Sequence, residues 1–335
     1  MISSRYRLFT TATAAVAAAA LPFFVADQYQ LHLATLIGVY WILVAGLNLV
    51  VGFSSQLSIG HVGLLAIGSY TFTILAGQNG VDPFSATVTA GAIGATCGFL
   101  LGLPSLRLPG FYFAMATLAF ALIVGELSLA QQELTGGGAG LAVPGFPSPF
   151  DTPGGFYWLV LATAVLVTGA TANIARSMWG RALVAIRDSE VAARANGVPV
   201  FQMKLLVFTF SGFTAGLSGA LFASLQTYIT PETFTFELGL FFFVAIIIGG
   251  RGSILGPFLG TVLLTALPEV VAPLARLGNF FYGALLLVVV LSVPEGIGHL
   301  INTLRERFRP TKVEKQLVSP NLNRLGAAIS AGRPL

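Results

Sequence analysis

The stretch LHLATLIGVYWILVAGLNLVVGFSSQLSIGHVGLLAIGSYTFTILAG, residues 31–77, contains no Asp, Glu, Lys or Arg. A helix needs about 20 apolar residues to cross the core of a bilayer, so this stretch is long enough for two crossings. Between them the chain becomes polar and glycine-containing at GFSSQ, residues 52–56. Irregular backbone at membrane depth is tolerated only where it is buried or lines a cavity. The stretch therefore predicts two membrane spans, at 31–51 and 57–77, with a polar break between them.

The composition of the whole chain extends this pattern. Its 335 residues are 55% hydrophobic and 9% charged, with a mean hydropathy of +0.85, whereas a soluble domain is about 25% charged. We therefore expect an all-α polytopic membrane protein with about ten transmembrane helices, some of them broken or re-entrant. The short eighth span is the candidate for a re-entrant piece. The other eight predicted spans are 8–26, 83–103, 111–131, 156–175, 205–225, 236–249, 254–272 and 277–293.

The distribution of basic residues predicts the orientation. Cytoplasmic loops carry an excess of Lys and Arg, and such residues cluster before the first span, at 176–204 and after residue 304. An even number of predicted spans separates these clusters, which places both termini and the central run in the cytoplasm. The predicted organisation is a basic end with the first span (1–30), a transmembrane domain (31–304) and a basic tail (305–335). The first segment also has features of a cleavable signal peptide.

Several classes of chemistry have no motif in the chain. None of its lysines, Lys204, Lys312 and Lys315, follows a glycine, whereas a Walker A loop needs Gly-Lys-Ser/Thr. Cys97 is the one cysteine and the three histidines are far apart, so the sequence predicts no metal site. We find no paired acids and no nucleophile–base set within the spans. The expectation is a protein that is not an enzyme, with no bound cofactor and no nucleic-acid partner.

The segment GRALVAIRDSEVAARANGVPV, residues 180–200, is unusually charged for this chain. At 100° per residue it forms two stripes on a helix. One is charged (Arg187, Glu190, Arg194), and the other is small (Ala182, Ala185, Ser189, Ala193, Asn196). Gly197 stands where a C-cap glycine belongs, with Pro199 beyond it. As an alternative, Asp188 and Ser189 could cap a second short helix. The pattern predicts a helix that docks in a groove of a partner, and the other interpretation is a solvated cytoplasmic loop.

The residues AARANG (192–197), preceded by Glu190, resemble the E-A-A-x-x-x-G loop of ABC-importer permeases, although the glutamate stands one place further from the alanine pair. Further segments resemble the branched-chain amino-acid permeases, most closely their M-type subunit. These segments are co-linear with the family: GLNLVVGFSSQLSIGHVGLLAIGSY (46–70), RLPGFYFAMATLAFALIVGEL (107–127), TGGGAGLAVP (135–144), GRALVAIRDSEVAARANG (180–197) and IIIGGRGSILGPFLG (246–260).

The resemblance implies an importer of the bacterial inner membrane. Its other parts would be a second related permease, two ATP-binding subunits that hold ATP and Mg²⁺, and a periplasmic substrate-binding protein, with lipid around the spans. The substrates it implies are Leu, Ile and Val, or else urea, short amides or aromatic acids. The predicted ATPase-docking residues are Ala182, Ala185, Arg187, Asp188, Ser189, Glu190, Ala192, Ala193, Arg194 and Gly197.

A polar cluster inside the apolar sequence is the candidate substrate pathway. Discontinuous helices near the substrate are common in transporters, and Glu126 is added because an acid within a span usually has a purpose. A second glycine-rich break, at 249–260, is weakly similar to residues 52–63 and suggests an internal repeat. The alternatives are helix packing by small residues and, for the whole chain, an ion-coupled secondary transporter. The pathway candidates are Asn48, Ser54, Gln56, Ser58, His61 and Glu126.

Overall fold

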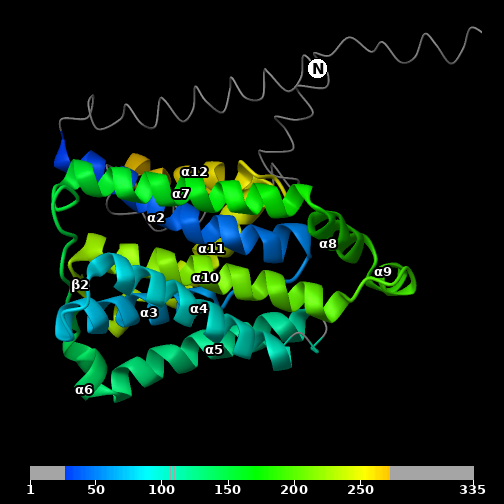
Figure 1. Cartoon of the computed structure of the whole chain (residues 1–335), viewed down its shortest axis with the longest axis horizontal. Helices are drawn as coiled ribbons and strands as arrows, with labels where there is room; N and C mark the ends of the chain where they lie inside the picture. The colour runs from blue at the N-terminus through cyan, green and yellow to red at the C-terminus, as the bar shows by residue number, and fades with distance from the viewer. Residues whose placement is uncertain (1–26, 106, 109, 272–335) are drawn as a thin grey trace, which may run out of the picture. The chain divides into compact units, whose positions relative to one another are not determined.

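The computed structural model describes residues 27–105, 107–108 and 110–271. This part of the chain is predominantly helical (Figure 1). Its longer helices are α2 (Gln28–Asn48), α3 (His61–Phe72), α4 (Pro83–Ser105), α5 (Phe111–Ala130), α7 (Pro153–Arg176), α8 (Met178–Asp188), α10 (Val200–Gln226), α11 (Phe236–Gly249) and α12 (Gly256–Val271). The shorter elements are η1 (Leu49–Phe53), η2 (Thr73–Gln78), α6 (Gln132–Thr135), η3 (Gly137–Ala139), β1 (Leu141–Ala142), α9 (Glu190–Ala195), β2 (Tyr228–Ile229) and η4 (Pro231–Thr233).

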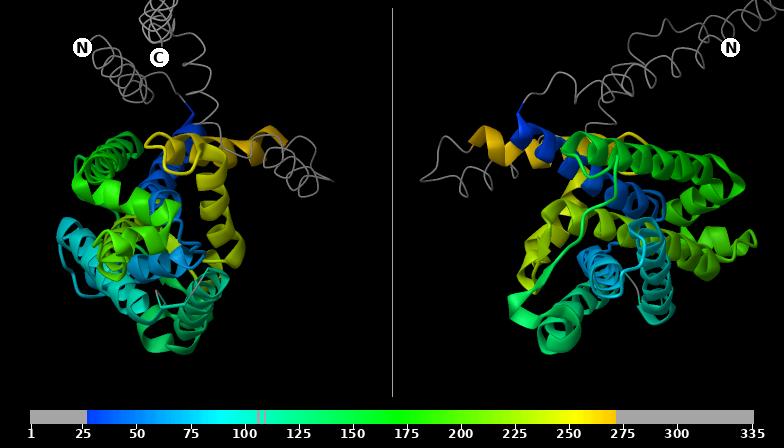
Figure 2. Two further views of the ribbon diagram at one scale, coloured as in Figure 1. Left: turned by 90° about the vertical axis from the view of Figure 1, so that its right-hand side faces the viewer. Right: turned by 60° about the vertical axis from the view of Figure 1, so that its left-hand side comes forward.

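Helix α10 lies at the centre of the packing. It contacts α4, α3 and α2, while α7 packs on α2, and α12 packs on α11 and α2 (Figures 1 and 2). The side chains that α10 buries are mostly small or aromatic, with Phe208 and Phe222 almost fully enclosed. By contrast, α7 buries only six of its 24 residues. The sequence thus distinguishes an inner helix from outer ones, because small residues allow other helices to approach α10 closely.

The crossing of α4 and α10 shows how close this approach is. A Cβ atom added to Gly94 of α4 would lie 2.5 Å from the carbonyl oxygen of Gly212 and 2.9 Å from Cα of Gly216, both on α10. A Cβ added to Gly216 would lie 2.3 Å from the carbonyl oxygen of Ala90. The two backbones are therefore in direct contact, and glycine is required at this crossing.

Within the described residues, six helices are long and apolar enough to cross a membrane: Gln28–Phe53, Pro83–Pro104, Phe111–Ala130, Pro153–Arg176, Val200–Gln226 and Pro231–Gly249. They correspond to six of the ten predicted spans, and the count of ten is not confirmed. The predicted span at 254–272 is a shorter apolar helix, Gly256–Pro268 within α12. The predicted span at 57–77 becomes helical only at His61. The predicted spans 8–26 and 277–293 and the tail 305–335 lie outside the described residues.

The all-α prediction needs one addition. Strands β1 and β2 form an antiparallel pair in which Leu141 lies opposite Ile229 and Ala142 opposite Tyr228. Two-residue strands have no periodicity that a sequence pattern could detect. This pair connects the segment after α5 to the end of α10, at the opposite end of the helices from α8 and α9 (Figure 1).

Candidate functional site

The predicted polar break is a non-helical segment, residues 54–60, between η1 and α3. Ser55 within it has a φ of 57°, a left-handed conformation that few residues other than glycine adopt. The polar groups of the segment are bonded inside the protein. Ser54 Oγ donates to the carbonyl of Val50 at 2.7 Å, and the amide of Ile59 donates to Thr117 Oγ1 at 3.2 Å. Such bonding allows irregular backbone to persist among apolar helices.

Asn48 connects this break to the second glycine-rich break. Its Nδ2 donates to the carbonyl of Ser253 at 2.8 Å, and its Oδ1 accepts from the amide of Gly252 at 3.1 Å. Arg251 adds a bond at 3.2 Å to Ser55 Oγ. The two segments that the sequence identified as weakly similar are therefore in contact, although about 200 residues separate them. Arg251 was not among the predicted site residues.

His61, at the first residue of α3, is enclosed by the protein. It is 1% exposed, Nδ1 lies 2.9 Å from Ser58 Oγ, and Nε2 lies 2.8 Å from Ser211 Oγ. The ring also contacts Phe208 edge to face, with centroids 5.4 Å apart. Both ring nitrogens thus have partners within the chain. This geometry favours the packing interpretation of His61 over a substrate contact.

Of the remaining two pathway candidates, Gln56 belongs to the cluster at the break and Glu126 does not. Gln56 is buried in the break, and its Nε2 donates to Ser54 Oγ at 2.8 Å. Glu126 is exposed near the far end of α5. Glu126 is thirteen positions after Phe113, which lines the same cavity as the break, so at 1.5 Å per residue the distance along α5 is roughly 20 Å. The structure therefore brings Asn48, Ser54, Gln56, Ser58 and His61 together and leaves Glu126 outside this cluster.

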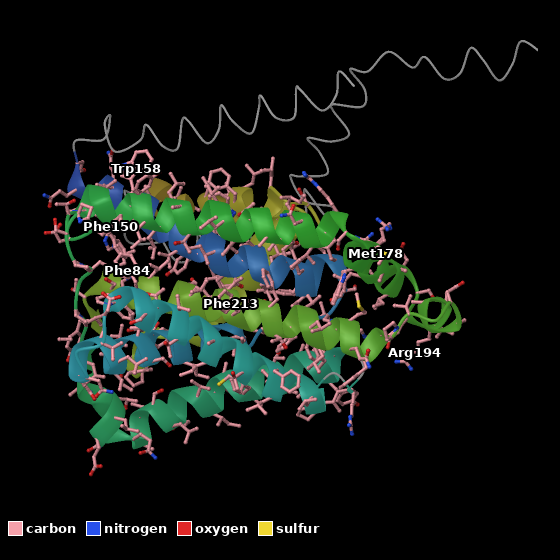
Figure 3. All side chains as sticks on the ribbon, in the orientation of Figure 1. Phe84, Phe150, Trp158, Met178, Arg194 and Phe213 are labelled. Carbon is pink, nitrogen blue, oxygen red and sulfur yellow. The ribbon has the colours of Figure 1, made fainter. Side chains whose placement is uncertain are left out.

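The predicted docking helix at 181–197 is two helices, α8 and α9, and the alternative with two pieces is the one observed. Ser189 separates them with extended backbone (φ −161°, ψ 110°), and its Oγ accepts from the amide of Ala192 at 3.3 Å. A serine at this position caps the second helix. The continuous small stripe is therefore wrong, because Ala182 and Ala185 lie on one helix and Ala193 on the other. Figure 3 places Met178 and Arg194 at this end of the helices.

These two helices have an inner and an outer side. Leu183, Ile186 and Ala193 are buried against the rest of the protein. In contrast, Ala185, Ala192 and Arg194 are exposed. Large apolar side chains are exposed here as well: Met178 at 72%, Trp179 at 49% and Val191 at 80%.

Gly197 ends α9 as the sequence predicts. Its φ is +78°. Its amide donates to the carbonyl of Arg194 at 3.0 Å, and the amide of Val198 donates to the carbonyl of Ala193 at 3.1 Å. This pair of bonds is the Schellman motif, in which the C′ residue takes a left-handed conformation. Among the described residues, a Cβ at Gly197 would meet no atom within 4 Å, so the backbone conformation is what requires glycine.

The charged residues of this segment bind the rest of the chain. Glu190 pairs with Lys204 of α10 at 2.8 Å and with Arg194 at 2.6 Å. The hydrogen bond from Lys204, supported by Arg194, holds the pKa of Glu190 below its usual range. Arg187 lies 3.4 Å from Asp188 and reaches the carbonyl of Gly52 at 3.5 Å. Lys204 was missed as a site residue, and only its opposite charge could have suggested the pairing.

A cavity of about 330 Å³ joins the docking segment to the break. Its walls come from three parts of the chain: the break, the beginning of α5, and α8–α9 with the first turn of α10. Its lining residues include Gln56, Leu57, Phe113, Arg187, Asp188 and Lys204. Members of the two sets that the sequence predicted separately, Ser54 and Gln56 for the pathway and residues 187–190 for docking, thus line one cavity.

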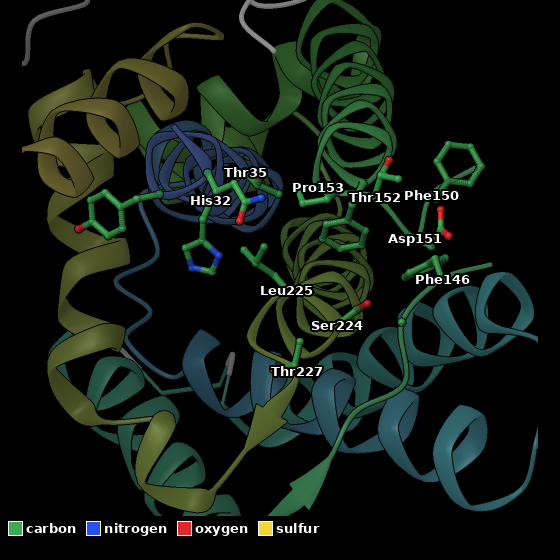
Figure 4. Close-up of a pocket in the computed structure, with 14 residues that line it drawn as sticks. His32, Thr35, Phe146, Phe150, Asp151, Thr152, Pro153, Ser224, Leu225 and Thr227 are labelled. Atoms are coloured by element: carbon green, nitrogen blue, oxygen red, sulfur yellow. The ribbon is translucent and has the colours of Figure 1, made fainter. Parts of the chain in front are cut away.

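A second cavity, of about 440 Å³, lies at the opposite end of the helices (Figure 4). His32 and Thr35 of α2, Asp151 and Thr152 before α7, and Leu225 of α10 line it. The sequence analysis did not identify these residues. They come from three distant segments, none of which has a motif.

The chain is similar to known transport permeases over most of its length. The family model described as branched-chain amino acid transport system / permease component matches residues 29–290. The chain is 34% identical over 309 residues to the high-affinity branched-chain amino acid transport system permease protein LivM of Salmonella typhimurium, which covers 84% of this chain and 72% of the relative. LivM of Escherichia coli matches with the same identity and coverage.

A more distant relative is the autoinducer 2 import system permease protein LsrC of Enterobacter sp., 29% identical over 273 residues, covering 78% of this chain and 76% of the relative. No solved structure matches the chain. The family match covers most of the described helices, including both breaks and the docking segment. The chain belongs to the family of branched-chain amino acid transport permeases.

Proposed function

We propose that this permease moves branched-chain amino acids, Leu, Ile and Val, into the cytoplasm as one subunit of an ABC importer. The other subunits are a second related permease, two ATPases and a periplasmic binding protein. The ATPases bind ATP and Mg²⁺, and this chain transmits the movement of the ATPases to the substrate pathway. The observation that carries the proposal is the arrangement of α8 and α9. They expose apolar side chains on their outer side, and on their inner side they pair with Lys204 of α10 and approach the carbonyl of Gly52.

The charge distribution supports the orientation. All seven Lys and Arg residues of the described part lie at the end of the helices where α8 and α9 are found. Basic residues remain on the cytoplasmic side of a membrane, so we assign this end to the cytoplasm. The second cavity, with His32 and Asp151, then faces the periplasm. The basic residues are Arg107, Arg176, Arg181, Arg187, Arg194, Lys204 and Arg251.

The outer side of α8–α9 supports docking. Met178, Trp179 and Val191 are large, apolar and exposed, and exposed apolar patches mark interaction sites. Ala185 and Ala192 are also exposed, and small side chains allow a partner to approach the backbone. Arg187 and Glu190, by contrast, bind groups of this chain. We therefore assign docking to the small and apolar residues, and attachment to the inner charges.

The outer face of α5 supports contacts within the membrane. Its large apolar side chains are more than half exposed, which suits lipid or the second permease. They are Phe111, Tyr112, Met115, Leu122, Ile123 and Leu127.

The docking test replaces Ala192 with Trp. Ala192 is exposed, so the larger side chain disturbs no packing within the chain but blocks a close partner. We expect loss of ATPase-subunit co-purification with normal amounts of permease in the membrane. The matched control is Ala139→Trp, an exposed alanine at the opposite end of the helices. Unchanged co-purification of Ala192→Trp would show that this surface does not dock.

A second docking test uses the end of α9. Gly197→Leu forces a left-handed conformation that costs roughly 1–2 kcal/mol for a residue with a Cβ, and should uncouple ATP hydrolysis from transport. Gly197→Asn is the control, because Asn tolerates this conformation better. If Gly197→Leu transports as well as Gly197→Asn, the assignment of α8–α9 as the coupling element is wrong.

The energy source and substrate are tested by uptake of labelled leucine in cells that carry the complete importer. We expect uptake to stop when ATP is depleted and to persist when an uncoupler removes the proton gradient. The reverse result would identify an ion-coupled secondary transporter. Competition by isoleucine and valine, but not by urea or short amides, would distinguish the proposed substrates from those alternatives.

A further inference from the structure

The cavity between α8, α5 and the polar break has the size and lining of a small-molecule site. Its volume of about 330 Å³ falls within the range of ligand pockets, roughly 300–1,000 Å³. Apolar side chains of Leu57 and Phe113 form one part of its wall, and charged side chains of α8–α9 form another. A cavity with separate apolar and charged walls suits an amphiphilic ligand.

Gln56 gives the cavity an unused polar group. Its side chain is 6% exposed, and among the described residues no donor lies within hydrogen-bond distance of its Oε1. The orientation of the amide is fixed by its neighbour: Ser54 Oγ gives its proton to the carbonyl of Val50, so it accepts from Gln56 Nε2. Buried polar atoms nearly always have partners. Gln56 lines the cavity while its Oε1 is buried, so a rotation of the side-chain amide toward the cavity would let this unpaired acceptor bind a ligand that donates.

The charged side chains on the α8–α9 wall differ in how closely they contact other groups of the chain. Lys204 and Glu190 form a short contact of 2.8 Å. Arg187 and Asp188 are joined only at 3.4 Å, and their side chains are 36% and 66% exposed. The second contact of Arg187, to the carbonyl of Gly52, is 3.5 Å long. Contacts of this length lie beyond the usual range of hydrogen bonds, so both groups have capacity for a ligand.

We propose that this cavity binds a zwitterionic α-amino acid with an apolar side chain, on the side of the membrane where α8 and α9 lie. Arg187 binds the carboxylate, while Asp188 and Gln56 Oε1 receive the ammonium group. The apolar side chain lies against Leu57 and Phe113. The identity of the ligand as the transported amino acid rests on the proposed function. Because Arg187 also contacts Gly52, a bound ligand holds α8 against the break.

The first test uses the unaltered full-length permease, purified in its complex without the binding protein. We expect saturable binding of radiolabelled L-leucine. Isocaproate lacks the ammonium group and isoamylamine lacks the carboxylate, so each should compete about tenfold more weakly, as expected for loss of a hydrogen bond to a charged group. Absence of saturable leucine binding, or competition by either half-ligand as strong as that by unlabelled leucine, would overturn the site.

The second test locates that binding. Asp188→Asn and Gln56→Leu should each weaken leucine binding about tenfold. The matched controls, Glu133→Gln and Gln78→Leu, change exposed residues at the opposite end of the helices and should bind leucine normally. Unchanged affinity in both Asp188→Asn and Gln56→Leu places the binding elsewhere and refutes the proposal.

The two proposals fail in different ways. If the complete importer takes up leucine but its cavity does not bind it, the site is wrong and the proposed function stands. If the cavity binds leucine but the importer does not take it up, the proposed function is wrong and the site stands.

Discussion

The contact between the two helix breaks should depend on Asn48. Its side chain is 3% exposed and makes two hydrogen bonds to the second break, at 2.8 Å to the carbonyl of Ser253 and at 3.1 Å from the amide of Gly252. Asn48→Ala removes both bonds and leaves the two backbone groups without these partners. The replacement is smaller than asparagine and has good helix propensity, so α2 itself should remain intact.

The free-energy cost of Asn48→Ala follows from the number of hydrogen bonds that it removes. A net contribution of about 1 kcal/mol for each hydrogen bond gives about 2 kcal/mol in all. Since 1.4 kcal/mol is a factor of ten, the second break should open about 30 times more often. Asn48→Asp keeps the acceptor for Gly252 and loses the donor for Ser253, so its effect should be clearly different from that of alanine.

The assay is hydrogen–deuterium exchange of the purified permease, followed in peptides that cover residues 248–256. We expect exchange at the amide of Gly252 to become about 30-fold faster in Asn48→Ala. Asn79→Ala, at an exposed asparagine of the opposite end, is the control and should leave these peptides unchanged. Equal protection of Gly252 in Asn48→Ala and the unaltered protein would show that Asn48 does not hold the two breaks together.

Three further predictions concern other contacts. Gly94→Ala places a Cβ 2.5 Å from the carbonyl oxygen of Gly212 and should cost about 1–3 kcal/mol, seen as a lower Tm in detergent. Gly125→Ala, where a Cβ meets nothing within 4 Å, should not lower it. Ser211→Ala leaves Nε2 of buried His61 unpaired and should destabilise by about 1–3 kcal/mol; an unchanged Tm would contradict this bond. The ion pairs of Glu190 lower its pKa. They should therefore stabilise α9 fully at pH values above the ordinary glutamate pKa, and this stabilisation should be lost as the pH falls through the lowered pKa. The protection of residues 190–197 against exchange, measured relative to the intrinsic rate at each pH, should then fall on acidification in the unaltered protein but not in Glu190→Gln. At neutral pH the two proteins should differ by about 0.5–1 kcal/mol, because Glu190 is partly exposed.

The apolar pattern was sufficient to predict most of the long helices. Helices α2, α4, α5, α7, α10 and α11 each correspond to one predicted span, because a helix that crosses lipid needs both length and apolar side chains. The end of α9 was predictable for a different reason. Gly197 favours the left-handed conformation of a C-cap, and Pro199 prevents the helix from continuing.

The error at the third span has a physical cause. Leu57 and Ile59 are apolar, so hydropathy assigns them to a helix, although the backbone is irregular until His61. Hydropathy measures side chains and does not detect a bond such as that from the amide of Ile59 to Thr117. The same limit applies to the partners of His61 and Glu190, since Ser211 is 150 residues away and Lys204 lies on another helix.

Movement of α8 and α9 can reach the pathway through a short chain of contacts. Ile186 packs into the core, Arg187 reaches Gly52, and Asn48 of the adjoining helix holds Gly252. These contacts end on the two breaks, where backbone bonding is irregular and rotation about φ and ψ costs less than in a helix. The central helix α10, by contrast, is 27 residues long and largely buried, so it should move as a rigid body. We therefore expect a displacement applied to α8 to be absorbed at residues 52–60 and 250–256; the first of these segments lines the cavity together with α8. We therefore expect Asn48→Ala and Gly197→Leu both to impair the coupling of ATP hydrolysis to transport. Asn48→Ala would act at the helix breaks, and Gly197→Leu would act at the end of α9.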